Sequence, residues 1–172
     1  MVSKEMDAEI FEVMKQVLMK NEYMSLLGIE VLKIRRGYCR GRIRVSGKIM
    51  NPYGFLHRGS LYSLADIIGG TAACTYGNFV TTVSGSMNFL IPANKTEYVY
   101  CEANVVRQGG HLGVYDLKLF AEDGTVLENA SFTYYITDKQ VLQWKKENAC
   151  NIDKENAGNT DKENAGNMDK GV

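Results

Sequence analysis

Apolar and polar residues alternate with a period of two along much of the second half of the chain. Residues 98–107 are a clear example, because Val99, Cys101 and Ala103 fall on one face and more polar residues fall on the other. This alternation is typical of strands that bury one face. Two strands are expected on either side of Gly37, at residues 29–36 and 38–45, and the pattern predicts four more, at residues 81–90, 98–107, 114–121 and 126–136. Asp123 and Gly124 predict a tight hairpin between the last two.

Two segments carry helical patterns instead. Residues 4–20 place apolar side chains at helical spacing with charges between them, which predicts an amphipathic helix. Residues 59–76 are small or apolar on every side, so we expect a helix that is covered all round. A membrane span is an alternative for so apolar a segment, but Gly69, Gly70 and a carboxylate in its middle disfavour it. The whole pattern predicts an α+β fold, in which a curved antiparallel sheet wraps around one long central helix.

The end of the chain has a different composition. Trp144 is the last aromatic residue, and beyond it the sequence repeats in octads, KKENACNI, DKENAGNT and DKENAGNM. Such segments bury too little apolar surface to offset the entropy of ordering the chain. We therefore predict one folded domain over residues 1–144 and a disordered tail over 145–172. The tail is either inert or a binding segment.

Charge and cysteine content narrow the class of protein. Twenty Lys and Arg balance twenty Asp and Glu, which argues against a nucleic-acid-binding domain. Charged residues near the start interrupt any secretory signal. The cysteines and histidines are scattered and form no metal-binding spacing: Cys39, Cys74, Cys101, Cys150, His57 and His111. We expect a cytoplasmic protein with reduced thiols, no metal and no other cofactor.

Asp66 is the only charged side chain between Gly59 and Asn94. A carboxylate within a buried helix is costly unless it is paired or has a chemical role. One interpretation is that Asp66 bonds backbone or hydroxyl groups and fixes the helix. The other is that it acts as a general base or nucleophile at a sheltered site.

The start of the same helix forms a second candidate site. A loop over residues 51–57 leads into it, and unpaired N–H groups at a helix N-terminus can polarise a carbonyl oxygen. Arg58 and Asp66 are eight residues apart, about 12 Å along a helix. If both act on one substrate, Asp66 must come from a second copy whose helix runs antiparallel, so the active unit is at least a dimer.

One motif carries a family resemblance, N-x-x-G-x-x-H-x-G-x-x-x-x-L-A-D, which spans Asn51 to Asp66. With Leu27-Gly28-Ile29, the segment 84–93 and Gly124, it resembles the hotdog-fold acyl-CoA thioesterases of the PaaI (phenylacetyl-CoA thioesterase) type. The resemblance covers about residues 20–137. It implies the hotdog fold, assembly into homodimers and commonly homotetramers, and acyl-CoA as substrate.

The resemblance also implies roles for single residues. Asp66 would attack the thioester or activate water, and the backbone N–H of Arg58 would polarise the thioester carbonyl. Asn51 and His57 would line the site, and Ser84 would help to place the water. Read without the family, Asn51 starts a plain Asn-Pro turn, His57 is a structural residue at a helix start, and Ser84 is an ordinary strand serine.

Arg58 departs from the family, which usually has glycine there. The amide N–H survives this change, but the long cationic side chain either binds a phosphate or carboxylate of the substrate or obstructs the site. Arg107, Gly109 and Gly110 occupy the turn that lies near CoA in similar proteins, although two glycines also make a simple turn. Four side chains either line an acyl pocket or belong to the core: Tyr53, Phe55, Tyr62 and Met87.

The functional prediction is hydrolysis of an aryl- or medium-chain acyl-CoA. The alternative is a catalytically weak acyl-CoA-binding or regulatory hotdog domain. A hotdog dehydratase comes third, because its usual Asp/His arrangement is not evident in the sequence.

Overall fold

The structure is a computed structural model that describes residues 4–93 and 95–148. Within these residues the elements follow one another in this order: α1 (Lys4–Met19), α2 (Glu22–Leu27), β1 (Ile29–Arg35), β2 (Tyr38–Arg44), the 3-10 turn η1 (Gly47–Ile49), α3 (Arg58–Cys74), β3 (Asn78–Phe89), β4 (Tyr98–Gln108), β5 (Leu112–Ala121) and β6 (Val126–Gln140). A further helix covers residues 141–148.

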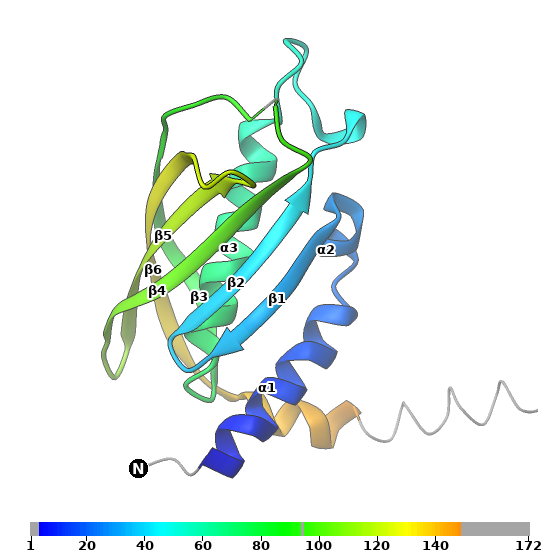
Figure 1. The fold of residues 1–172 in the computed structure, drawn as a ribbon. Coiled ribbons are helices and arrows are strands. Elements are labelled where there is room, and N and C mark those ends of the chain that lie inside the picture. Colours follow the sequence, from blue (N-terminus) through cyan, green and yellow to red (C-terminus); the bar gives the residue numbers. More distant parts are fainter. Residues whose placement is uncertain (1–3, 94, 149–172) are drawn as a thin grey trace, which may run out of the picture.

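The strands of the described part form one six-stranded antiparallel sheet in the order β1-β2-β4-β5-β6-β3. The sheet curves around α3, the long central helix (Figure 1). All six predicted strands are present, and β6 continues four residues past its predicted end at 136. Gly124 turns between β5 and β6 with φ of 86°. The prediction of an α+β hotdog architecture is confirmed.

The core lies between the concave face of the sheet and α3. Leu64, Ala65 and Ile68 of α3 are fully buried against it. Gly41 of β2 lets the helix approach closely, since a Cβ there would collide with the side chain of Ile68. The hydroxyl of Tyr134 donates a hydrogen bond to the backbone oxygen of Asp66 at 3.1 Å and joins α3 to β6.

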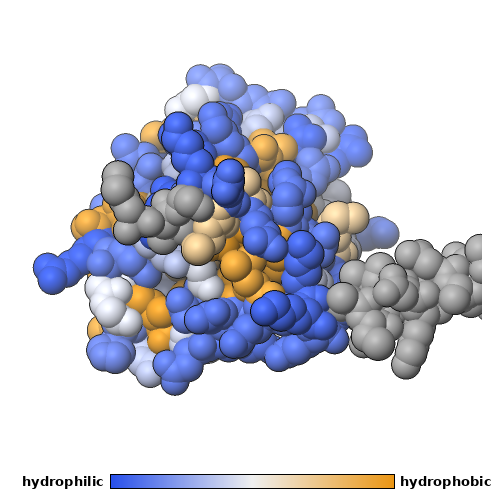
Figure 2. All heavy atoms as spheres, turned by 90° about the horizontal axis from the view of Figure 1, so that it is seen from below, coloured by the Kyte–Doolittle hydropathy of each residue, from blue (hydrophilic) through white to orange (hydrophobic). Residues whose placement is uncertain are grey.

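A second, smaller core closes the end of the molecule that carries α1. Ile10, Val13 and Met14 of α1 pack with Cys74 at the end of α3 and with Val141. Seen from this end, the surface is largely hydrophilic around a central apolar area (Figure 2). The helix over 141–148 continues four residues beyond the predicted boundary at 144, because Val141 anchors its first turn in this core. The rest of the predicted tail, 149–172, lies outside the described residues.

Sequence patterns missed α2, a helix of six residues. Asn21 caps its first turn through a hydrogen bond from the N–H of Met24 to the Asn21 side chain. Gly28 ends the helix with φ of 69°, a conformation that favours glycine. The six residues of α2 make fewer than two helical turns, which is too short for a periodic pattern of apolar residues to appear in the sequence.

The expectation that α3 is covered on every side is wrong for the single chain. A stripe along the helix is exposed or half-buried, and it consists of Gly59, Tyr62, Ser63, Asp66, Ile67 and Gly70. The adjacent strand β3 is an edge of the sheet, and Val83 at its centre is 59% exposed. The sheet of one copy therefore leaves one side of its central helix open.

Candidate active site

A cavity of about 630 Å³ lies at the N-terminus of α3. Its walls come from the loop that precedes α3, from the first turns of the helix and from the segment that follows β3. This loop is at the top of Figure 1. Asn51, His57 and Arg58 all line the cavity, as do Tyr53 and Phe55. The structure thus brings together the predicted site residues of the helix start, whereas Tyr62 and Met87 do not line it.

Asn51 organises the loop. Its side-chain oxygen accepts hydrogen bonds from the backbone N–H groups of Tyr53 at 2.9 Å and Phe55 at 3.1 Å. Its own backbone N–H donates to the oxygen of Phe55 at 2.7 Å. These bonds form a closed turn of the Asx type. Asn51 therefore has the structural role in a turn that the sequence offered as the alternative to a site residue.

His57 is the N-cap of α3. Its backbone is extended, and its Nδ1 accepts a hydrogen bond from the N–H of Gly59 at 2.9 Å. Since Nδ1 accepts, the proton of the neutral ring lies on Nε2. The N–H of Gly59 is therefore occupied by the cap and is not the group that polarises a ligand.

Arg58 is the first residue of α3, and its backbone N–H has no acceptor among the described residues. A free N–H at this position, together with the helix dipole, favours a partial negative charge beside it. The guanidinium lies over the ring of Phe89, 5.1 Å from its centroid. This stacking holds the cationic side chain against the wall formed by β3.

Asp66 lies two turns further along α3 and does not line the cavity. It is half-buried rather than buried, because it belongs to the open stripe of the helix. Its Oδ1 accepts a hydrogen bond from the hydroxyl of Thr82 at 2.7 Å. Among the described residues, nothing donates to its other oxygen, which leaves that oxygen available for chemistry.

Ser84 makes no hydrogen bond to Asp66 within the described residues. The register shifts between Thr82 and Ser84, so that Thr82 pairs with buried Tyr134 and Ser84 pairs with Thr133. This irregularity leaves Thr82 on the inner face of the sheet and Ser84 on the outer face. The hydroxyl beside Asp66 is therefore that of Thr82, which sequence spacing could not distinguish from Ser84.

Arg107 lies near the end of β4, and Gly109 and Gly110 form the turn between β4 and β5. The backbone N–H of Gly109 donates to the oxygen of Leu112 at 2.8 Å and closes the turn. This turn is at the end of the sheet away from the loop before α3 (Figure 1). Within one chain, the predicted CoA contacts and the cavity are far apart.

Glu128 is a cavity residue that sequence reasoning missed. It lies on β6, it is 1% exposed, and burial raises its pKa to about 7, although the nearby Arg58 guanidinium lowers it. Its Oε2 has no hydrogen-bond partner among the described residues. A signal was available in the sequence, because Glu128 shares the strand face of Ala130, Phe132 and Tyr134.

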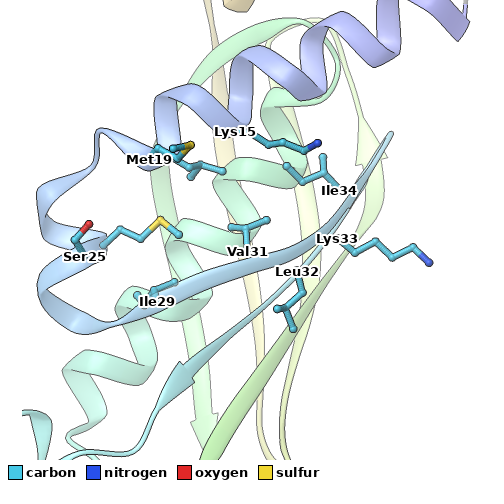
Figure 3. Close-up of a pocket in the computed structure, with 10 residues that line it drawn as sticks. Lys15, Met19, Ser25, Ile29, Val31, Leu32, Lys33 and Ile34 are labelled. Carbon is cyan, nitrogen blue, oxygen red and sulfur yellow. The ribbon is translucent and has the colours of Figure 1, made fainter. Parts of the chain in front are cut away.

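A second cavity, of about 500 Å³, lies between α1 and β1 (Figure 3). Apolar side chains such as Met24, Ile29 and Val31 dominate its lining, and Lys33 extends away from it. Neither a carboxylate nor a histidine lines it. It therefore lacks the groups that an acyl-transfer reaction needs, and the cavity at α3 is the better candidate for an active site.

The described residues form neither a metal-binding cluster nor a site with a reactive thiol. No cluster of His, Cys, Asp and Glu could hold a metal ion there. Cys39, Cys74 and Cys101 are buried and unpaired, and burial raises the pKa of the Cys74 thiol to about 12. These three cysteines form no disulfide in the described residues, and their reduced state stays a prediction. No helix in this part of the chain is both long and apolar enough to cross a membrane.

Comparisons with known proteins agree with this fold. Residues 53–128 match the Thioesterase superfamily. Acyl-coenzyme A thioesterase PaaI of Escherichia coli is 28% identical over 93 residues, which cover 54% of this chain and 66% of PaaI. The structure of E. coli PaaI superposes with a TM-score of 0.74 at 19% identity, over 78% of this chain and 97% of that one.

Two further structures share the fold at low identity. A thioesterase family protein of Silicibacter pomeroyi gives a TM-score of 0.69 at 24% identity, over 74% of this chain and 97% of that one. A Streptococcus mutans protein bound to acetyl CoA gives 0.62 at 24% identity, over 64% and 90%.

The fold is the hotdog architecture, and the family match and the PaaI relative support a thioester hydrolase. The matched segment contains α3, β3, β4 and β5, which are the elements that build and flank the site. Over residues 53–128 the chain is similar to the thioesterase superfamily, and its likeness is to the PaaI type.

Proposed function

We propose that this protein hydrolyses the thioester of an acyl-CoA that carries an aryl or medium-chain acyl group. The observation that carries this proposal is the unpaired N–H of Arg58, which begins α3 at the wall of the 630 Å³ cavity. A donor fixed at a helix N-terminus stabilises the negative oxygen that forms when a thioester is attacked. The surrounding side chains of Tyr53, Phe55 and Leu61 offer an apolar lining for the acyl group.

The reaction needs a carboxylate beside the carbonyl carbon. Asp66 would either take a proton from water, which then adds to this carbon, or attack it directly to give an anhydride that water opens. In both routes the C–S bond breaks, the acid is released, and the CoA thiolate leaves and takes up a proton. Thr82 would hold the Asp66 carboxylate in place through its hydrogen bond.

A second copy of the chain would supply that carboxylate. Asp66 is about 12 Å along α3 from Arg58, and it lies on the open stripe of the helix rather than in the cavity. The edge strand β3, with its exposed centre, borders the same stripe. A two-fold partner with antiparallel α3 would cover both features and deliver its Asp66 to the cavity.

The remaining predicted residues take supporting parts in this proposal. Asn51 and His57 would act mainly by shaping the loop and the helix start, since their hydrogen bonds are already made within the chain. Arg107, Gly109 and Gly110 would reach CoA only across the assembly, because the β4–β5 hairpin end that carries them is remote from the cavity of their own chain.

A thiol-release assay over a panel of acyl-CoA esters tests the activity. Wild type should release CoA from aryl or medium-chain esters, and Asp66→Ala should release almost none. Binding of these esters without thiol release would instead support the acyl-CoA-binding or regulatory domain. Full turnover by Asp66→Ala would overturn the mechanism.

Subunit mixing tests the shared site. Arg58→Pro removes the critical N–H with little disturbance, because proline is well tolerated at the first helical position and His57 before it is extended. Mixing this variant with Asp66→Ala gives hybrid dimers with one intact site. At random exchange, about a quarter of wild-type turnover should return. No return despite confirmed exchange would show that the two groups do not act across the interface.

A further inference from the structure

The floor of the cavity contains a carboxyl group that the proposed reaction does not use. Glu128 is 1% exposed and lines the cavity, and its Oε2 accepts no hydrogen bond from any described residue. Buried polar atoms without a partner are uncommon in folded proteins and costly. An unpaired, buried oxygen at a cavity wall points to a group that a ligand satisfies.

The surroundings of Glu128 are apolar. Its cross-strand neighbours are Phe89 on β3 and Leu119 on β5, and Leu119 is fully buried. The guanidinium of Arg58 stacks on Phe89 and acts on the Glu128 carboxyl through space. No ion pair joins the two side chains in the described part of the structure. Arg58 therefore moderates the cost of the buried charge without occupying its oxygen atoms.

The cavity has an exposed mouth and a buried floor. Tyr53 is 83% exposed, whereas Leu56 and Leu61 are each 2% exposed, and Glu128 is as buried as they are. Arg58, which begins α3, is also exposed and lies toward the mouth. A thioester whose carbonyl meets the Arg58 N–H would extend its acyl group from there toward the floor. This step rests on the proposed function.

We propose that Glu128 determines specificity by accepting a hydrogen bond from a hydroxyl or amino group at the far end of the acyl group. An acyl group with such a donor satisfies the buried oxygen, whereas a purely apolar one displaces solvent from it and leaves it unpaired. A hydrogen bond to a charged, buried acceptor corresponds to a discrimination of about 10- to 100-fold. The substrate class is therefore a hydroxylated or aminated acyl-CoA.

Paired substrates test this assignment directly on wild-type protein. Each pair differs only in a hydroxyl at the far end of the acyl group, in one case on a six-carbon chain and in another on an aromatic ring. We expect kcat/KM to favour the hydroxylated member of at least one pair by about 10- to 100-fold. Equal values, or a preference for the plain member in every pair, would overturn the proposal.

Variants assign the preference to Glu128. Glu128→Leu keeps a similar volume but has no acceptor, so the preference should disappear and the plain ester should be hydrolysed at least as fast. Glu128→Gln keeps a neutral acceptor and should retain part of the preference. The matched control is Glu102→Gln, since Glu102 pairs with Arg40 on the outer face of the sheet, and it should behave as wild type. A full preference in folded Glu128→Leu would refute the role, and if that variant does not fold, an unchanged preference in Glu128→Gln would refute it.

A binding measurement separates this proposal from the proposed hydrolysis. Thioether analogues of the same acyl-CoA pairs cannot be hydrolysed, and their affinities are measured by titration calorimetry. A hydroxyl preference in binding without any thioester turnover would support the role of Glu128 and contradict the hydrolase. Turnover without a hydroxyl preference, either in binding or in kcat/KM, would support the hydrolase and contradict the role of Glu128. Failure of every analogue to bind would overturn the subsite.

Discussion

The two parts of α3 that carry candidate chemistry are built in opposite ways. The N-terminus is enclosed, with a cavity, a free N–H on Arg58 and a buried carboxyl on Glu128. The middle of the helix is open, with Asp66 half-buried beside the exposed edge strand β3. One region offers a place for a substrate, and the other offers a reactive group without such a place.

In the proposed mechanism, neither region is a complete active site. A helix rises about 1.5 Å per residue, so its rigid geometry fixes the separation of Arg58 and Asp66. The open stripe also explains why α3 can carry a carboxylate among apolar residues. Asp66 lies on the stripe and does not enter the core of its own chain, so its charge is not fully buried. The predictions below test the two regions separately, from the largest expected effect to the smallest.

Replacing Asp66 should have the largest effect. Asp66→Asn keeps the shape of the side chain and an oxygen that can accept from Thr82, but it removes the base or nucleophile. We expect kcat to fall by about 10²- to 10⁴-fold in a thiol-release assay. Asp116→Asn on β5 is the control and should retain wild-type turnover. A loss smaller than threefold in Asp66→Asn would remove the open region from the mechanism.

The enclosed region is tested by separating the backbone of Arg58 from its side chain. Arg58→Pro deletes the N–H and should lower kcat by about 10²- to 10³-fold, the usual effect of losing one oxyanion donor. Arg58→Ala retains the N–H and should keep most of kcat while it alters KM. Equal loss of kcat in both variants would assign the effect to the guanidinium and contradict polarisation by the backbone.

The folded-state environment of Glu128 predicts a pH effect on stability. Burial raises its pKa from 4.5 to about 7, so the folded state favours the protonated form. Between these values the unfolded chain loses this proton first, and stability falls as pH rises, by about 3 kcal/mol in total above pH 7. Glu128→Gln should remove this loss.

Denaturant unfolding at about pH 4 and pH 8 measures that effect. The difference in free energy of unfolding, Glu128→Gln minus wild type, should rise between these pH values by about 3 kcal/mol. Both proteins are compared at one concentration, because assembly would also stabilise them. A difference that does not change with pH would mean that Glu128 is not buried as a charged group above pH 7.

The fold was largely predictable because its signals are local. Alternation located β3, β4, β5 and β6, Gly37 marked the boundary between β1 and β2, and the uniform apolar character of residues 59–76 located α3. What the sequence could not supply was the extent of the cover around α3. The sheet of one copy covers only part of α3. The composition of α3 cannot show this, because a helix that a second copy covers has the same apolar composition as one that its own chain encloses.

The site was predictable only in part. The spacing of Asn51, His57 and Arg58 placed them together, since all three lie within one loop and one helix start. The partner of Asp66 was missed because a register shift in β3 exchanges Thr82 for Ser84, and such irregularities leave no periodic signal. Glu128 was missed because a carboxylate is usually exposed, although its place on the face of Ala130 and Phe132 indicated burial.

The smallest predicted effect concerns the orientation of Asp66. Thr82→Val is nearly isosteric and removes the hydroxyl that donates to Oδ1 at 2.7 Å. Because this hydrogen bond is partly exposed, its loss should lower kcat by only about fivefold, equivalent to about 1 kcal/mol. Thr81→Val is the matched control, since Thr81 pairs with Tyr135 on the outer face of the same strands. Equal effects of the two substitutions would mean that β3 acts through its packing and that the Thr82 hydroxyl does not position the carboxylate.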